Sequence, residues 1–203
     1  MSFINDNFML KNETAKLLYN KYAKDMPIVD YHCHISPREI YEDKRFDSIT
    51  ELWLGGDHYK WRLIRSNGVS EEEITGNADP KTKFIRFAEA LSKSIGNPMY
   101  HWTHLELKRY FGYDGILNAD TAEEVYELCN KKLREPEMSA RGIINASNVK
   151  MIGTTDDPID SLEWHIKLAA DKSFKTRVCP SFRPDKAVNI DKAGFADYIA
   201  ALS

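Results

Sequence analysis

The sequence predicts an α/β protein built around a parallel sheet. Three short apolar runs, at residues 27–34, 148–155 and 175–179, have the composition of buried strands. A helical pattern follows the second run and another follows the third, an order typical of right-handed βαβ units. Residues 37–147, between the first two runs, show helical patterns and no convincing strand.

Composition indicates an ordinary globular protein. The chain has 203 residues, of which 42% are hydrophobic and 29% charged, which argues against disorder. No apolar run approaches the ~20 residues of a membrane span, and a formal charge of −3 favours neither nucleic acid nor an anionic membrane as partner. Three widely spaced cysteines and an N-terminus unlike a signal peptide predict a cytoplasmic protein. Length alone suggests one complete domain.

Apolar spacing and proline define the N-terminal elements. A helix is expected over about residues 12–22, with its apolar side chains on one face. Pro27 disfavours the helical conformation for Met26 and ends this helix before the first strand, which covers residues 27–34. Ser36-Pro37 ends the strand.

Three local patterns predict helix starts further along the chain. Asp79 and Pro80 have the pattern of an N-cap and a first-turn proline. Residues 121–124 and 160–163 each resemble a capping box. The apolar residues expected on the buried faces of these three helices are Phe84, Phe87, Ala88 and Leu91 in the first, Val125, Leu128, Cys129 and Leu133 in the second, and Leu162, Ile166 and Ala169 in the third. A last helix is expected from about Ile190.

The sharpest chemical feature is a His-x-His pair at the end of the first strand. Because side chains alternate along a strand, Asp30, His32 and His34 are expected on one face, with Cys33 pointing away. Two imidazoles at this spacing can converge on one divalent ion, and nitrogen ligands favour zinc, manganese or iron over calcium. The alternative is a pair of polar residues satisfied by water and backbone.

Five segments, in order and spread over nearly the whole chain, match one family. They are residues 27–34 (PIVDYHCH), 53–62 (WLGGDHYKWR), 95–107 (IGNPMYHWTHLEL), 153–158 (GTTDDP) and 180–185 (PSFRPD). The first resembles strand one of the amidohydrolase superfamily, and the five together resemble the uronate isomerase (glucuronate isomerase) family within it.

This resemblance implies the N-terminal portion of a (β/α)8 TIM-type barrel, namely strands 1–3, with a large helical insertion after strand 1. Residues 1–36 would be the N-terminal helix and strand 1, residues 37–147 the insertion, and residues 148–203 strands 2 and 3 with their helices. A complete barrel takes ~250 residues. We therefore expect strands 4–8 to be missing and this chain to be inactive alone.

The family interconverts D-glucuronate with D-fructuronate and D-galacturonate with D-tagaturonate, so the implied partner is a hexuronate sugar. Such an aldose–ketose shift moves a proton between C2 and C1 and another between the two oxygens, and it requires a base and a group that polarises the carbonyl. No nucleic acid or membrane partner is expected, and the full-length protein is expected to be a homo-oligomer.

The resemblance also implies roles for five residues. His32 and His34 would bind a divalent metal, with zinc the first choice and manganese or iron the alternatives. His58 and Tyr59 would bind the substrate and act in catalysis. Arg183 would grip the uronate carboxylate with its planar fork. Without the resemblance, residues 58 and 59 would fit a packed helix face and Arg183 a solvated turn. The aspartate that the family carries on its last strand, a metal ligand and base, has no counterpart here.

Other polar residues near these motifs have simpler interpretations. Asp157 is expected to cap the following helix, whereas the orientation of Asp156 is left open. His101 and His104 are expected to pack within the insertion and His165 to be structural. None of the cysteines has a base at a telling spacing, so none is assigned as a nucleophile.

Two other function classes stay open. A metal-dependent hydrolase of the same superfamily would attack an amide or ester with metal-bound water. A non-catalytic chain would use the Trp- and Tyr-rich insertion for oligomerisation or partner binding, because exposed aromatic residues often mark interfaces.

Overall fold

The computed structural model describes residues 3–203. The chain divides into two compact units. The helical unit contains the residues up to 24 and residues 45–139, and the sheet unit contains residues 25–44 and 140–203. In the described part of the chain, no helix is both long and apolar enough to cross a membrane.

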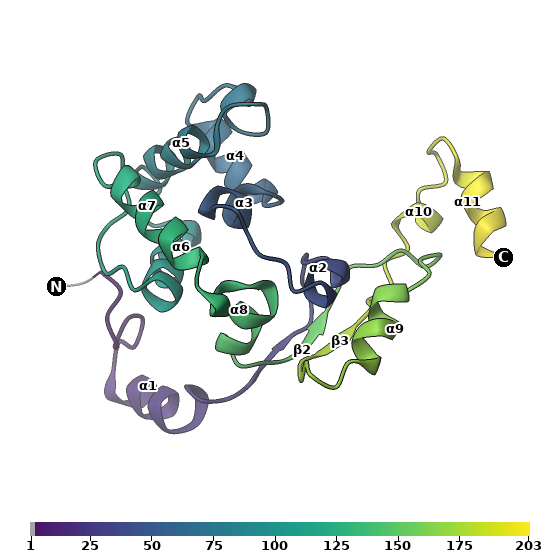
Figure 1. Cartoon of the computed structure of the whole chain (residues 1–203), viewed down its shortest axis with the longest axis horizontal. Helices are drawn as coiled ribbons and strands as arrows, with labels where there is room; N and C mark the ends of the chain where they lie inside the picture. Colours follow the sequence, from purple (N-terminus) through teal and green to yellow (C-terminus); the bar gives the residue numbers. More distant parts are fainter. Residues whose placement is uncertain (1–2) are drawn as a thin grey trace. The chain divides into compact units, whose positions relative to one another are not determined.

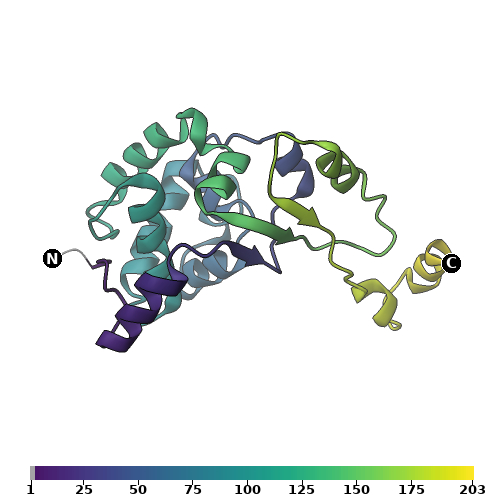
Figure 2. The same cartoon turned by 90° about the horizontal axis from the view of Figure 1, so that it is seen from below.

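The sheet unit is built on three parallel strands, which confirms the predicted sheet. Strands β1 (Ile28–Asp30), β2 (Val149–Gly153) and β3 (Arg177–Cys179) lie in the order β1-β2-β3 (Figure 2). Each strand is shorter than its apolar run: the residues after β1 and β2 leave the sheet to form loops, whereas β3 begins two residues into its run and ends where the run ends. The prediction that His32 and His34 lie on the strand is therefore wrong: both lie in the loop that follows β1.

Three of the helices in this unit pack against the sheet. Ile152 of β2 shares a buried cluster with Ile40 of α2, Ile144 of α8, Leu168 of α9 and Phe174. Figure 1 shows α2 and α9 side by side, and the two helices are in contact. The helices of the sheet unit are α2 (Pro37–Tyr41), α8 (Ala140–Ala146), α9 (Glu163–Ala170), α10 (Asp185–Val188) and α11 (Phe195–Leu202).

The predicted buried face of α9 is wrong. His165 and Leu168 are buried, whereas Ile166 is 66% exposed and Ala169 is also exposed. The cause is local: residue 162 adopts a left-handed conformation, with φ 55°, so it stands outside the helix. Asp160 accepts a hydrogen bond from the amide of that residue at 2.9 Å and does not cap the helix. Leu162 therefore does not belong to the helix face predicted with Ile166 and Ala169, and the helix instead buries His165 and Leu168, which are three residues apart.

The helical unit contains no strand among its described residues, apart from a single bridge between Arg45 and Ser139. Its first helix confirms the prediction for residues 12–22, because Asn12 caps α1 and a π-helical turn over Tyr19–Ala23 continues it. The α-helices of this unit are α1 (Glu13–Leu18), α3 (Ile49–Leu54), α4 (His58–Ser66), α5 (Pro80–Ser92), α6 (Pro98–Glu106) and α7 (Ala122–Leu133). A second π-helical turn covers Leu107–Phe111, and 3₁₀ turns cover Glu71–Glu73 and Pro136–Met138.

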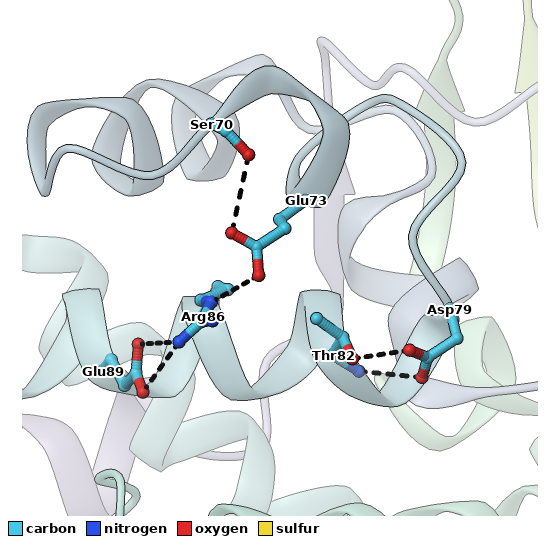
Figure 3. Close-up of polar contacts among 6 residues, drawn as sticks. All are labelled: Ser70, Glu73, Asp79, Thr82, Arg86 and Glu89. Atoms are coloured by element: carbon cyan, nitrogen blue, oxygen red, sulfur yellow. Dashed lines mark hydrogen bonds and ion pairs between the residues drawn. The ribbon is translucent and has the colours of Figure 1, made fainter.

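Helix α5 is the central element of the helical unit, since α3, α4 and α7 all pack on it. Asp79 caps it by accepting a hydrogen bond from the amide of Thr82 at 3.0 Å, as predicted. On its exposed side Arg86 pairs with Glu73 at 2.8 Å and with Glu89 at 3.1 Å (Figure 3). The residues predicted for its buried face are fully buried: Phe84, Phe87, Ala88 and Leu91.

Helix α7 is found where it was predicted, but the capping box predicted at its start does not form. The Thr121 hydroxyl donates to the Ile116 carbonyl at 2.7 Å and makes no cap hydrogen bond. Asn118 instead accepts hydrogen bonds from the amides of Asp120 and Thr121, at 2.9 and 3.1 Å. The Thr121 hydroxyl is therefore bonded within this turn and not to the first turn of the helix. Of the four residues predicted for the buried face, Leu128 is only half-buried and the other three are buried.

Candidate functional site

Hydrogen bonds join the three loops that follow the strands at the carboxyl edge of the sheet. The Cys33 amide donates to the Gly153 carbonyl at 2.8 Å, and the Thr155 hydroxyl donates to the Cys33 carbonyl at 3.1 Å. On the other side, the Thr154 amide donates to the Cys179 carbonyl at 2.9 Å. The loop after β2 is thus bonded to both of its neighbours.

Gly153 permits the close approach between β1 and β2. A Cβ atom at this position would lie 2.6 Å from the Tyr31 carbonyl oxygen, a distance that real Cβ atoms essentially never show. The carbonyl belongs to the residue just before His32. The glycine therefore helps to set where the His-x-His loop begins.

His32 and His34 come together in this loop. Their Nε2 atoms lie 3.1 Å apart, and both side chains are exposed. Two nitrogens bound to zinc at about 2.0–2.1 Å in a tetrahedral arrangement lie about 3.3 Å apart. The pair therefore fits two ligands of one divalent ion, although a hydrogen bond between the two imidazoles would have a similar length.

The described residues supply no third side chain that completes this pair as a metal site. No group of three or more His, Cys, Asp or Glu side chains between residues 3 and 203 is placed to hold a metal. Cys33 lies between the two histidines in the sequence but packs against the buried cluster of the sheet unit, as the alternation predicted. Burial raises the pKa of its thiol, which disfavours the thiolate that a metal would need.

The Asp156 carboxylate, whose orientation was left open, is turned inward. Asp156 is 8% exposed, and its Oδ2 accepts hydrogen bonds from the Thr154 hydroxyl at 2.7 Å and the Ser181 amide at 3.1 Å. His165 of α9 places Nε2 2.7 Å from the same hydroxyl. The histidine is buried in this network, in agreement with a structural role.

The prediction that Asp157 caps the next helix is wrong, because α9 begins only at Glu163. Its Oδ1 accepts from the Ile159 amide at 3.2 Å and from the Tyr198 hydroxyl at 2.8 Å, and its Oδ2 lies 3.0 Å from Lys186 Nζ. Hydrogen bonds from Lys186 and Tyr198 lower the pKa of this carboxyl group. Asp157 therefore ties its loop to α10 and α11.

Arg183 follows β3 at the same edge of the sheet as the two histidines. Its backbone amide donates to the Asp156 carbonyl at 3.2 Å. Its side chain is 47% exposed, and its Nε donates to Asp185 Oδ2 at 2.5 Å. Within residues 3–203 this ion pair uses Nε, which leaves Nη1 and Nη2 for a second carboxylate.

In the helical unit, His58 and Tyr59 begin α4. Asp57 caps this helix, because its Oδ1 accepts from the amides of Tyr59 at 2.9 Å and Lys60 at 3.1 Å. The rings of His58 and Tyr59 lie 4.5 Å apart, and both side chains are exposed. Both exposed rings thus sit at the start of a capped helix.

A partly buried ion pair lies at this helix start. Lys60 is 9% exposed, and its Nζ lies 2.9 Å from Asp57 Oδ2. Burial pushes the pKa of Asp57 upward, but hydrogen bonds and the charge of Lys60 outweigh it, so the pKa is lowered. Burial raises the pKa of Glu106, against the nearby charge of Lys60. Sequence reasoning missed this cluster, although an aspartate directly before a helix is a recognisable cap signal.

The other two histidines of the helical unit pack within it, as predicted. His104 is buried, with Nδ1 2.6 Å from the Tyr100 carbonyl and Nε2 accepting from the Leu117 amide at 3.0 Å. Burial lowers its pKa. His101 packs edge-on against Phe8, with the ring centroids 5.4 Å apart. Neither arrangement suits a metal ligand.

The structure thus brings together some of the predicted site residues. His32 and His34 converge, and Arg183 follows another strand of the same sheet at the same edge. His58 and Tyr59 lie in contact with one another in the helical unit. The roles assigned to these five residues stay predictions.

Comparisons with known proteins agree on one family. A profile of the glucuronate isomerase family matches residues 1–203. A uronate isomerase of Lachnospira eligens is 59% identical over 201 residues, which are 99% of this chain and 43% of that protein. A uronate isomerase of Lachnoclostridium phytofermentans is 59% identical over 200 residues, which are 98% of this chain and 43% of that protein. The chain therefore spans less than half the length of these relatives.

Solved structures agree with this result. The uronate isomerase of Thermotoga maritima is 39% identical to this chain and superimposes on it with a TM-score of 0.92. The match covers 99% of this chain and 44% of the Thermotoga protein. The glucuronate isomerase of Caulobacter crescentus, at 24% identity, shares the fold with a TM-score of 0.84. This match covers 94% of this chain and 42% of the Caulobacter protein. Since the family profile covers every residue of the sequence, the chain belongs to the glucuronate isomerase family.

Proposed function

We propose that the protein containing this chain is a uronate isomerase that interconverts D-glucuronate with D-fructuronate and D-galacturonate with D-tagaturonate. The observation that carries this proposal is the match of residues 1–203 to the glucuronate isomerase family. Because the chain spans 43% of the relatives it matches, the proposal concerns the complete protein. By itself the chain is proposed to be inactive.

In this proposal the sheet unit forms the first part of a (β/α)8 barrel. Residues 1–36, 37–147 and 148–203 are then the N-terminal helix with strand 1, the insertion, and strands 2 and 3 with their helices. The parallel order of β1, β2 and β3 supports this assignment. Active sites of such barrels lie at the carboxyl ends of the strands, where the His-x-His loop and Arg183 are found.

His32 and His34 are the residues proposed to hold a divalent metal, and their 3.1 Å separation supports a shared ion. Imidazole ligands suit zinc, manganese and iron, and zinc is our first choice. When bound, such a metal supplies Lewis-acid polarisation of a sugar oxygen. Further ligands would come from water or from residues outside this chain.

Arg183 is proposed to bind the carboxylate that distinguishes a uronate from a neutral sugar. Asp185 pairs with Nε at 2.5 Å and so steadies the plane of the guanidinium. The terminal amino groups can then bind the substrate carboxylate in a bidentate manner, which fixes the orientation of the sugar chain.

His58 and Tyr59 are proposed to contact the sugar hydroxyls and to move protons between its oxygens. A tyrosine hydroxyl and an imidazole can each donate or accept a proton at these positions. The cap from Asp57 supports this role, because it holds the first turn of α4 in place. Proton transfer requires positioned donors within hydrogen-bonding distance of the reacting atoms.

The proposed location is the cytoplasm, which the free thiols of Cys33, Cys129 and Cys179 support. The complete protein is further proposed to be a homo-oligomer. Trp102 supports this idea, because it is 58% exposed on α6 and tryptophan is enriched at protein interfaces.

The test is to express the open reading frame that contains this chain up to its stop codon and to follow D-glucuronate by NMR. We expect the ketose D-fructuronate as product, with slower formation in the variants His32→Gln and Arg183→Met. Release of acid from an amide or lactone without ketose formation would support the hydrolase alternative instead. A protein with no reaction and no metal uptake would indicate an interaction module.

A further inference from the structure

We propose that Thr154, Asp156 and His165 form a positioning clamp that holds the Arg183 loop at the carboxyl edge of the sheet. The clamp itself is inferred from contacts within the sheet unit. Its consequence for binding a uronate carboxylate rests on the proposed function.

The first part of the clamp is the Asp156 side chain. Its Oδ2 accepts one hydrogen bond from the Thr154 hydroxyl at 2.7 Å and another from the Ser181 amide at 3.1 Å. Burial of a carboxylate is unfavourable unless hydrogen bonds compensate for the lost water. The buried carboxylate therefore holds the loop after β2 and the loop after β3 to one another.

The second part is the backbone of the same residue. The Asp156 amide donates to the Ser181 carbonyl at 3.3 Å, and the Arg183 amide donates to the Asp156 carbonyl at 3.2 Å. The regular ladder between β2 and β3 ends at the pair Gly153 and Cys179. Beyond that pair, the two loops stay aligned through the contacts of Asp156, which include an isolated parallel bridge to Phe182.

The third part is His165, which fixes the direction of the Thr154 hydroxyl. That hydroxyl has one proton and lies 2.7 Å from both Asp156 Oδ2 and His165 Nε2. Two oxygen acceptors lie within reach of this proton, Asp156 Oδ2 and, at 3.1 Å, the Cys179 carbonyl. Neither can donate, so the hydroxyl donates to the nearer one, Asp156, and accepts from His165. The imidazole therefore carries its proton on Nε2, and α9 contributes directly to the alignment of the two loops.

The clamp matters for Arg183 because few contacts hold its side chain. The guanidinium is exposed and pairs with Asp185, a neighbour in its own loop. Its position therefore follows that of its backbone, whose amide is bound to Asp156. A loose clamp would spread the guanidinium over many positions and weaken a bidentate contact with a carboxylate.

The test compares two matched substitutions by amide hydrogen exchange in the 203-residue chain. Thr154→Val removes the hydroxyl and keeps the volume, whereas Thr154→Ser keeps the hydroxyl and loses a methyl group. We expect the valine variant to exchange the Ser181 and Arg183 amides about tenfold faster or more than the unmodified chain. In the serine variant these rates should stay within about threefold of those in the unmodified chain. The β2–β3 ladder amides should change little in both. Faster exchange in the serine variant than in the valine variant would indicate packing alone and overturn the clamp.

A second pair of variants keeps the test decisive if the valine variant fails to fold. His165→Gln retains a donor near the position of Nε2, and His165→Met removes it, so exchange at Arg183 should rise with methionine and much less with glutamine. In the unmodified chain, nitrogen-15 NMR of the His165 ring should show the proton on Nε2. A proton on Nδ1 alone would contradict the proposed hydrogen-bond direction.

Kinetics of the protein from the complete reading frame test the functional consequence. Thr154→Val should raise KM for D-glucuronate about tenfold with a smaller change in kcat, because the carboxylate-binding group is less well positioned. Thr154→Ser should keep KM close to that of the unmodified protein. The exchange experiments contain no sugar, so they separate the two claims. If the Ser181 and Arg183 amides still exchange slowly in the valine variant, the clamp is overturned. If the exchange results support the clamp but the complete protein has no isomerase activity, the proposed role of the clamp in substrate binding is overturned.

Discussion

Replacing Gly153 by alanine should destabilise the sheet unit, because β1 and β2 leave no room for a side chain there. The added Cβ would lie 2.6 Å from the Tyr31 carbonyl oxygen and 3.3 Å from Ser181 Oγ. Ordinary contacts of this kind begin near 3.4 Å, so the first falls short by about 0.8 Å. The obstructing atom belongs to the backbone, so the two strands must move apart.

Overpacking of this kind costs about 1–3 kcal/mol of unfolding free energy. In proteins of about 150–250 residues, each kcal/mol shifts Tm by about 2–4 °C. We therefore expect Gly153→Ala to lower the melting temperature by about 2–12 °C. The same movement would displace the start of the His32–His34 loop.

Circular dichroism during heating provides the assay, with Gly56→Ala as the matched control. A Cβ at Gly56 would meet nothing within 4 Å. This control should melt within about 2 °C of the unmodified chain, since surface substitutions usually change stability by less than about 0.5 kcal/mol. A Gly153→Ala chain that melts like the Gly56→Ala chain would refute the close-approach argument.

Three further predictions concern the core, an ion pair and a thiol. Phe87→Ala should cost about 3–5 kcal/mol in urea unfolding, because Phe87 is fully buried against Trp53; a cost below about 1 kcal/mol would contradict that packing. Hydrogen bonds from Ser173 and Arg141 lower the pKa of Asp171 from 3.8 to about 2, so its contribution to stability is present above about pH 4 and disappears as the pH falls toward 2. Asp171→Asn should therefore show a smaller loss of stability across that window in acid titrations, and an unchanged profile would count against it. Burial raises the pKa of Cys129 to about 12, so mass spectrometry should find it the last cysteine to react with iodoacetamide in the native chain; labelling as fast as that of Cys179 would be the contrary result.

Elements whose signals are local could be predicted from the sequence. Helix α5 is the clearest case, because Asp79 and Pro80 define its start and the apolar spacing defines its buried face. The parallel order of the strands also followed from the alternation of strand and helix along the chain. These features depend on neighbours within a few residues or on general rules of chain topology.

Features that depend on competing partners could not be predicted in this way. Thr121 has the spacing of a capping residue, but a turn centred on Asn118 uses its hydroxyl. The start of α9 shifts because Leu162 takes a left-handed conformation after the Asp157 turn. In each case several nearby groups could satisfy the same donor, and the local pattern does not say which one does.

The candidate site was predicted in part. The pairing of His32 with His34 was expected from strand alternation, yet it arises in a loop that hydrogen bonds to Gly153 and Thr155 hold in place. The inward orientation of Asp156 could not be predicted, because one of its hydrogen-bond partners, Ser181, lies 25 residues further along the chain. Such contacts become visible only when the strands are placed side by side.

The central claim is that this chain carries one part of the active site of a uronate isomerase. Its most direct test is the rate of D-fructuronate formation from D-glucuronate, measured for the protein from the complete reading frame and for residues 1–203 alone. We predict ketose from the protein of the complete frame and none from the 203-residue chain. Ketose formation by the chain alone would contradict the claim that it holds only part of the site, and its absence from the complete protein would contradict the isomerase function.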